Sequence, residues 1–282
     1  MVRLAASVPG ASWSERFAML KRLNVSATGV GLPPDAPVEE RVRVTETFRA
    51  AGVAMVQLGC YANLECLDER LLAGNRERLR MAIASAAELG VEAVVTGPGH
   101  MHPGLVEQVY AAHPDNWTTQ AMDRLVASCE AIVPATEGTA VKLCLEPWSI
   151  HTLNSPAKLE ELVRRVNHPG LRVLLDPVNL MDLQTYFCNG DVINDCFDRL
   201  GDNIWLVHAK DTLLDASKFT YYLSEARPGL GVLDYRTLLR RLAELPERTP
   251  LFIEHLRTME EVEAACAYIR QVANEVGVAF QT

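Results

Sequence analysis

The sequence predicts an α/β fold in which strands and helices alternate, a (β/α)8 barrel. Short apolar segments alternate with longer amphipathic segments along the chain, and eight such units can be counted. No GxGxxG motif follows the first strand, which favours the closed barrel over a doubly wound open sheet. The length of 282 residues is also normal for a barrel that needs about 250 residues before insertions.

The predicted strands are short and almost entirely apolar, as expected for parallel strands covered on both faces. The segment Arg172–Asp176 is typical, because only its first and last residues are polar. In chain order the predicted strands are Arg3–Val8, Ser26–Leu32, Ala54–Cys60, Ala93–Gly97, Val141–Glu146, Arg172–Asp176, Ile204–Ala209 and Leu251–Glu254.

The segments between these strands carry the signals of amphipathic helices. Ser155 is predicted to cap one helix and Pro156 to begin it, and apolar residues follow at the spacing of one helical face. Gly90 predicts the end of another helix. Further helices are expected over Leu79–Leu89, after Asp234 and over Glu260–Val276. The longest irregular stretches, His100–Asn116 and Asp211–Val232, each follow a strand, so we expect both on the active face.

The composition predicts a single domain over residues 1–282. Hydrophobic residues make up 49% of the chain and charged residues 22%, and no linker or shift in composition divides it. No apolar run is long enough for a membrane span, and the first ten residues do not read as a secretory signal. Seven cysteines without a CxxC pair predict buried, reduced thiols and a cytoplasmic protein.

The charge pattern bears on the partners of the protein. A net charge of -9 without a basic patch argues against a nucleic-acid partner. The densest basic segments carry their charges at helical spacing, which is typical of solvated helix faces. We therefore expect a small-molecule partner, no nucleic acid and no membrane, and the sequence leaves a homo-oligomer open.

Four polar side chains stand where late strands end, and they are Glu146, Asp176, His208 and Glu254. One such residue alone is more often a helix cap, half of an ion pair or a satisfied core histidine. In a barrel, however, these strand ends converge, and three carboxylates without a cation would repel one another at a large desolvation cost. One divalent metal ion removes this problem. Three carboxylates and one imidazole suit Mn²⁺ or Mg²⁺ and also accept Co²⁺ or Zn²⁺.

Five segments resemble the sugar phosphate isomerase/epimerase family, a group of xylose isomerase-like TIM barrels that includes D-tagatose 3-epimerase. They are LEP at 145–147, LLDPVN at 174–179, VHAKD at 207–211, RPGLG at 227–231 and FIEH at 252–255. Their order and spacing are more specific than any one of them. The resemblance implies that Glu146, Asp176, His208 and Glu254 are the metal ligands. It also implies that Glu146 and Glu254 act as acid and base on opposite faces of a bound ketose.

The chemistry that the resemblance implies is consistent with this set of residues. A metal ion that chelates a carbonyl oxygen and the neighbouring hydroxyl acidifies the C–H bond between them and stabilises the enediolate. A carboxylate on each face can then remove and return a proton, which inverts the carbon. The predicted function is therefore a divalent-metal-dependent sugar isomerase or epimerase, with Mn²⁺ preferred, that acts on a ketose or keto-sugar.

A further set of residues is predicted to contact the substrate: Arg227, Asn179, His102, Trp148 and Lys210. Arg227 matches an arginine that contacts substrate oxygens in the family, although a surface-loop ion pair is an equal alternative. His102 follows the fourth strand, where an exposed loop histidine is the competing interpretation. Trp148 is expected to line the sugar pocket or to serve in packing only. Asp211 is expected to orient a ligand or to cap a turn.

Two positions depart from the epimerase pattern. Many epimerases carry a histidine where this chain has Asn179, and an acid where it has Thr152. Both positions contact substrate in the family. The metal site therefore transfers to this chain, but the substrate of the 3-epimerases does not. No glycine loop that could cradle a phosphate stands out, which favours a substrate without phosphate.

Three other functions remain open at this point. A metal-dependent lyase or dehydratase acting on a keto-inositol or keto-sugar would use the same proton abstraction but expel a β-hydroxyl. An AP-endonuclease-like DNA repair enzyme shares the barrel, but it needs a three-zinc cluster with more histidines, and this chain has seven in all. A non-catalytic barrel subunit is disfavoured because all four ligand types are present.

Overall fold

The computed structural model describes residues 1–246 and 249–281 and confirms the predicted (β/α)8 fold. Eight parallel strands form a closed barrel in the order β1-β10-β7-β6-β5-β4-β3-β2. These strands are β1 (Arg3–Ala6), β2 (Ala27–Val30), β3 (Ala54–Gly59), β4 (Ala93–Thr96), β5 (Lys142–Leu145), β6 (Leu171–Leu175), β7 (Ile204–Ala209) and β10 (Pro250–Ile253). All eight predicted strands are thus present, with ends shifted by at most two residues.

The helices follow the strands as the sequence predicts. Their bounds are α1 (Trp13–Arg22), α2 (Val38–Ala51), α3 (Glu69–Leu89), α4 (Thr119–Ile132), α5 (Pro156–Val166), α6 (Asn189–Leu200), α7 (Tyr235–Glu244) and α8 (Met259–Val276). Ser155 and Pro156 begin α5 as expected. Helix α3 ends at Gly90 in the left-handed region, but it begins ten residues before the predicted start, because Asp68 accepts hydrogen bonds from two backbone N–H groups there.

The chain divides into two compact units, which are described separately. The first comprises Met1–Thr28, Ala51–Val53 and Leu175–Thr282, and the second comprises Gly29–Ala50 and Ala54–Leu174. This division does not test the prediction of a single domain over residues 1–282, which stays a prediction.

In the first unit, the pairing of β7 with β10 aligns two polar strand ends. Phe252 lies opposite His208 in this parallel register. Because side chains alternate between the faces of a strand, Lys210 and Glu254, two residues further on, lie on the same face as that pair. The register therefore brings these polar side chains to one face where the two strands leave the core.

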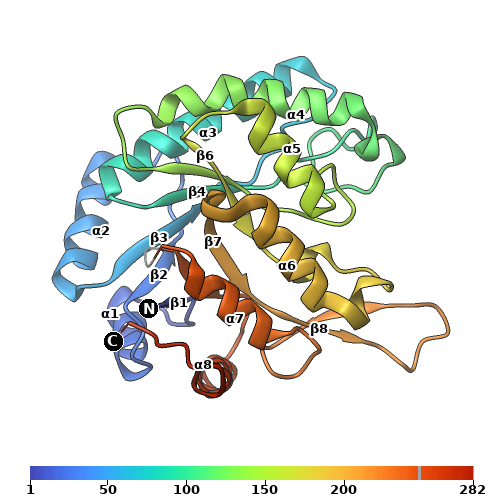
Figure 1. Cartoon of the computed structure of the whole chain (residues 1–282). Coiled ribbons are helices and arrows are strands. Elements are labelled where there is room, and N and C mark those ends of the chain that lie inside the picture. The colour runs from blue at the N-terminus through green and yellow to red at the C-terminus, as the bar shows by residue number, and fades with distance from the viewer. Residues whose placement is uncertain (247–248, 282) are drawn as a thin grey trace. The chain divides into compact units, whose positions relative to one another are not determined.

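In the second unit, strands β4, β5 and β6 pair in parallel, with Val95 opposite Cys144 and Cys144 opposite Arg172. The strands are almost fully buried, and helices α3 to α5 run along their outer side (Figure 1). Glu146 follows β5 directly. It lies on the same strand face as Cys144, two residues before it.

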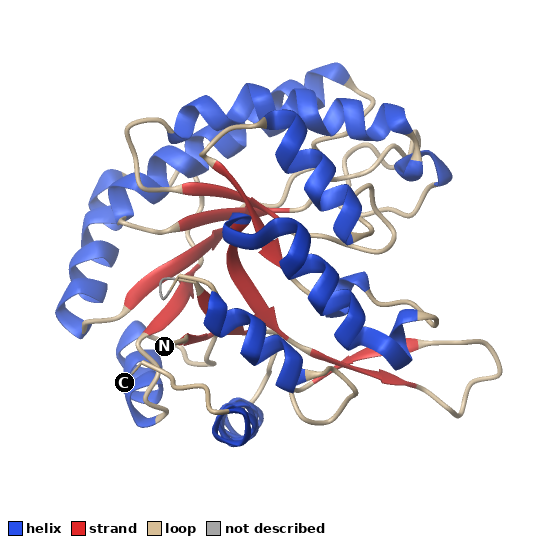
Figure 2. Cartoon of the chain, in the orientation of Figure 1, coloured by secondary structure: helices blue, strands red, loops and turns tan. Residues whose placement is uncertain are grey.

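One element differs from the prediction. The stretch Asp211–Val232 was expected to be irregular, but it contains an antiparallel hairpin of β8 (Asp211–Leu214) and β9 (Leu223–Ala226), which extends as an arm in Figure 2. These strands are only partly buried and carry no apolar run, so no local pattern predicts them.

The RPGLG segment after the hairpin is organised by Asp211. Its carboxylate accepts hydrogen bonds from the backbone N–H groups of Gly229, Gly231 and Leu233 at 2.9–3.0 Å. A Cβ atom on Gly231 would lie 2.2 Å from this carboxylate, so glycine is required there. Of the two predicted roles of Asp211, the capping of a turn is the one that these contacts support.

Two further sequence expectations can be compared with the structure. No helix in the described part of the chain is long and apolar enough to cross a membrane. All seven cysteines are free, and six are buried as predicted, whereas Cys188 is exposed.

Candidate metal centre and active site

Three of the four predicted metal ligands come together in the first unit, where β6, β7 and β10 end. The Nδ1 atom of His208 lies 2.7 Å from Oε1 of Glu254 and 3.7 Å from Oδ2 of Asp176. The ammonium group of Lys210 lies 2.8 Å from the same oxygen of Asp176 and 2.9 Å from the same oxygen of Glu254. We call these four residues the charged cluster. Each of its two carboxylates thus directs one oxygen toward the imidazole and the lysine.

Local structure holds the side chains of Asp176 and His208 in place. The other carboxylate oxygen of Asp176 accepts hydrogen bonds from the backbone N–H groups of Val178 and Asn179, at 3.1 and 3.3 Å. This turn fixes the carboxylate as the chain leaves β6. The ring of His208 lies 5.6 Å from the ring of Phe252, its register partner on β10. Backbone turns and strand register, rather than long flexible side chains, therefore set the geometry.

The charged cluster is buried, and its charges offset one another. Asp176 and His208 have no exposed surface, and Glu254 is 9% exposed. Burial alone would raise the pKa of each carboxyl. The positive charges of Lys210 and His208 outweigh this effect and lower the pKa of both Asp176 and Glu254. Both groups are therefore ionised at neutral pH, the form in which a carboxylate binds a metal ion.

Glu146, the fourth predicted ligand, lies in the second unit. It is 8% exposed, and its Oε2 atom accepts a hydrogen bond of 2.5 Å from the hydroxyl of Tyr61. Aromatic rings continue from Tyr61 to Tyr110, and from Tyr110 to Trp148 and His151, with centroids 4.5–5.9 Å apart. The carboxylate of Glu146 thus adjoins a row of aromatic side chains, which can pack against the apolar C–H face of a sugar.

Sequence reasoning did not select Tyr61, although a signal for it existed. Tyr61 follows the predicted strand Ala54–Cys60 directly, and a polar side chain just beyond a barrel strand is a site candidate. Only the hydrogen bond to Glu146 shows its connection to the candidate site.

The predicted substrate contacts His102, Trp148 and Asn179 are all half-buried. His102 is held by a hydrogen bond from the backbone N–H of Gly104 and by an edge contact with the ring of His113. It is therefore not the freely exposed loop histidine that the competing interpretation describes. A role in substrate binding stays a prediction for all three residues.

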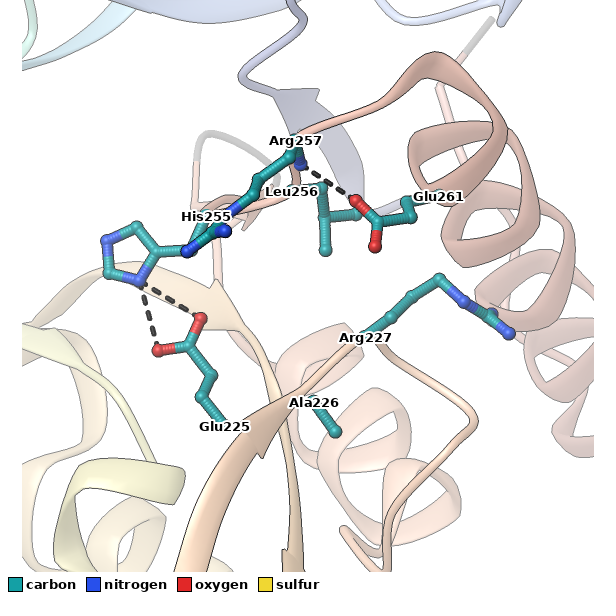
Figure 3. A pocket seen from close by; sticks show the side chains of 7 residues that line it. All are labelled: Glu225, Ala226, Arg227, His255, Leu256, Arg257 and Glu261. Carbon is teal, nitrogen blue, oxygen red and sulfur yellow. Dashed lines mark hydrogen bonds and ion pairs between the residues drawn. The ribbon is translucent and has the colours of Figure 1, made fainter.

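Arg227 lines a pocket of about 640 Å³ in the first unit, shown in Figure 3. The pocket lies between the end of β9, with Glu225 and Arg227, and the segment His255–Arg257 that follows β10. His255 has a positive φ of 60°, uncommon for a residue other than glycine, and its Nδ1 atom lies 3.0 Å from the Glu225 carboxylate. This hydrogen bond is the main reason that the pKa of His255 is raised. His255, which lines this pocket, is the residue directly after Glu254 in the chain.

This fold and this set of side chains define a class of protein. Residues 18–272 match the xylose isomerase-like TIM barrel family, and the chain belongs to that family. The predicted resemblance is thereby confirmed at the level of the family. No curated protein matches the chain.

Solved structures of similar fold support this assignment. A xylose isomerase-like TIM barrel protein from Mycobacterium smegmatis in complex with magnesium has a TM-score of 0.70 and 15% identity, and the match covers 98% of this chain and 97% of that one. D-psicose 3-epimerase from Clostridium cellulolyticum H10, solved with D-tagatose, has a TM-score of 0.72 and 13% identity, covering 96% and 99%. The probable 3-DHS dehydratase AsbF from Bacillus anthracis has a TM-score of 0.72 and 12% identity, covering 97% and 99%. At these identities the likeness concerns the fold.

Proposed function

We propose that this protein is a divalent-metal-dependent isomerase or epimerase of a ketose or related keto-sugar. It would remove a proton beside the carbonyl group and return a proton through an enediolate. The observation that carries the proposal is the buried group of Asp176, His208 and Glu254, whose two carboxylates stay ionised with one oxygen each directed at the imidazole. Membership of a barrel family that includes sugar epimerases among its structural neighbours supports it.

The donor set fits a divalent cation. Asp176, His208 and Glu254 would hold the ion, and Glu146 is proposed as the fourth ligand, so that three carboxylates and one imidazole are available. Mn²⁺ is the preferred ion on this chemistry, and Mg²⁺, Co²⁺ and Zn²⁺ also suit it. When bound, the ion would supply Lewis acidity that polarises a carbonyl group and the neighbouring hydroxyl.

The two glutamates are proposed as the groups that move protons. Glu254 is proposed to accept the proton, because its carboxylate is in the unprotonated form that a base requires and lies within the charged cluster. Glu146 is held by the hydroxyl of Tyr61, which fixes the direction of its carboxylate. If the two carboxylates face opposite sides of the substrate, removal on one side and return on the other inverts the carbon between them.

The remaining predicted residues are proposed to hold the substrate. Trp148 and its aromatic neighbours would pack against the sugar ring, and His102 and Asn179 would bind hydroxyl groups. Lys210 contacts the carboxylate of Glu254, and Arg227 lines the pocket that also contains His255; both are proposed to bind substrate oxygens. The protein is proposed to be cytoplasmic, which its free and mostly buried cysteines support.

A lyase that dehydrates a keto-inositol or keto-sugar is the second candidate. Its first step is the same proton abstraction, and the fold likeness to a probable 3-DHS dehydratase favours keeping it. The two reactions differ after this step, because the lyase expels a β-hydroxyl group whereas the isomerase returns a proton.

Proton exchange in D₂O tests the proposal and separates the two candidates. Keto-sugars and inososes would be incubated with the Mn²⁺-loaded protein and followed by ¹H NMR. We expect exchange of the hydrogen beside the carbonyl without loss of water, and we expect a chelator to stop it. Loss of water from the substrate would identify the lyase. Absence of exchange with every compound and metal would contradict both candidates.

A further inference from the structure

The pocket next to Glu254 contains two carboxylates that are already bound to other groups of the chain. Both oxygens of Glu225 lie within 3.1 Å of the imidazole Nδ1 of His255. One oxygen of Glu261 accepts hydrogen bonds from the backbone N–H groups of Arg257 and Thr258, at 2.8 and 3.1 Å, and so caps α8. Figure 3 shows both interactions at the wall of the pocket. These two acids are therefore engaged with the chain itself.

The two arginines that line the pocket are not engaged in the same way. Within residues 1–246 and 249–281, neither guanidinium is paired with a carboxylate. Arg227 donates one hydrogen bond of 2.9 Å to the carbonyl of Pro228, which leaves most of its five N–H donors available. Arg257 is exposed, and it reaches the pocket from the loop after β10, whereas Arg227 reaches it from the end of β9 (Figure 3).

We propose that this pocket binds an anionic group of the substrate, either a phosphate or a carboxylate. Guanidinium groups are permanently charged, and their N–H donors match the oxygens of both anions. The acids of the pocket are engaged and its arginines are available. The pocket should therefore bind an anion more tightly than a neutral hydroxyl group. The inference rests on the proposed function and narrows it to keto-sugars that carry a negative charge.

The position of the pocket relative to Glu254 supports this assignment. His255, which lines the pocket, follows Glu254 in the chain, and its Nε2 atom lies 3.7 Å from the Glu254 carboxylate. A substrate whose reacting carbon lies at Glu254 can therefore extend its charged end past His255 into the pocket that both arginines line.

The inference differs from the expectation drawn from the sequence. The absence of a glycine loop for phosphate favours a substrate without phosphate. Such loops bind phosphate through backbone N–H groups. In this pocket the donors are the side chains of Arg227 and Arg257, which lie 30 residues apart in the chain. No local motif could therefore reveal them.

Anion binding to the metal-free full chain tests the inference directly. Inorganic phosphate and, separately, glycolate would be titrated by calorimetry in the presence of a chelator, so that a bound metal ion cannot attract them. We expect saturable binding, weakened about tenfold or more by Arg257→Met and by Arg227→Met. Arg240→Met, which removes an exposed arginine on α7, should leave binding unchanged. The anion that binds more tightly identifies the group carried by the substrate.

Two outcomes would overturn the inference: neither anion binds in a saturable manner, or Arg257→Met leaves the dissociation constant unchanged. Because this assay needs no turnover, its failure is distinct from failure of the proposed function, which is the absence of proton exchange. As a second measurement, kcat/KM would be compared for a ketose and for its phosphate ester. Arg257→Met should lower the preference for the ester about tenfold. An unchanged preference would also overturn the inference.

Discussion

Two buried carboxyl groups in this protein behave in opposite ways. Asp176 and Glu65 both have no exposed surface. The pKa of Glu65 is raised well above its usual value because burial outweighs the hydroxyl of Thr152 and the charge of Arg124. The pKa of Asp176 is lowered because Lys210 and His208 outweigh burial. Burial therefore favours the neutral form of Glu65, whereas the neighbouring cations favour the ionised form of Asp176.

The difference lies in the cations beside each group. The ammonium of Lys210 contacts the Asp176 carboxylate directly, at 2.8 Å. The guanidinium of Arg124 instead donates to the backbone carbonyl of Glu65 and forms an ion pair with the carboxylate of Glu69. Burial alone thus does not mark a functional carboxylate. A buried carboxylate kept charged by neighbouring cations is the better candidate for metal binding.

The largest expected effect is the loss of activity in Glu254→Gln, with the same substitution at the buried Glu65 as its control. Glu254→Gln should lower kcat about 10³-fold or more, because it removes the proposed proton acceptor and metal ligand. Glu65→Gln should leave kcat nearly unchanged. Turnover of the active keto-sugar and thermal unfolding would be measured for both variants. Full activity in a folded Glu254→Gln protein would remove the basis of the proposed function.

The second prediction concerns the cation of the charged cluster. Lys210 contacts the two carboxylate oxygens that a metal ion would need, so the two cations compete for them. Lys210→Met should therefore tighten Mn²⁺ binding about tenfold in calorimetry and destabilise the metal-free protein, which is left with uncompensated buried charge. Weaker Mn²⁺ binding in this variant would mean that Lys210 supports the ligands instead. If the variant does not fold, crystal structures of the natural protein with and without Mn²⁺ would show whether the ammonium moves away from both oxygens.

The third prediction uses the neutral carboxyl of Glu65. Its pKa in the folded protein is raised above the usual 4.5, so both states are protonated at lower pH. As the pH rises above this value, only the unfolded chain ionises, and the folded state loses stability. Glu65→Gln removes this loss. Its unfolding free energy relative to the natural protein should therefore rise between pH 4 and pH 8, as measured in urea. A difference independent of pH would show that folding does not change the pKa of Glu65.

The smallest effect is expected where a similar ion pair lies at the surface. Lys158 contacts Glu161 at 2.7 Å, but the two side chains are 38% and 27% exposed. Lys158→Met should change the unfolding free energy by less than about 0.5 kcal/mol, because water screens the pair. It should leave Mn²⁺ affinity unchanged, and it is therefore the matched control for Lys210→Met. A large loss of stability would show that exposure is a poor guide to the strength of these pairs.

The sequence by itself determined the barrel and placed the candidate metal ligands at the ends of its strands. Alternating apolar segments located all eight strands, and Gly90, Ser155 and Asp234 marked helix ends that the structure confirms. These signals are local, because a strand or a cap depends on neighbours within a few residues. The same local signal placed Asp176, His208 and Glu254 at strand ends, although their joint role stays a proposal.

Only the tertiary structure decided which side chains act on one another. Strand register sets Lys210 beside Glu254 across β7 and β10, and chain folding brings Tyr61 to Glu146 from 85 residues away. The hairpin of β8 and β9 and the contact of Glu225 with His255 likewise join distant segments. Such contacts depend on the pairing of whole strands and turns, and a local pattern of residues carries no record of that pairing.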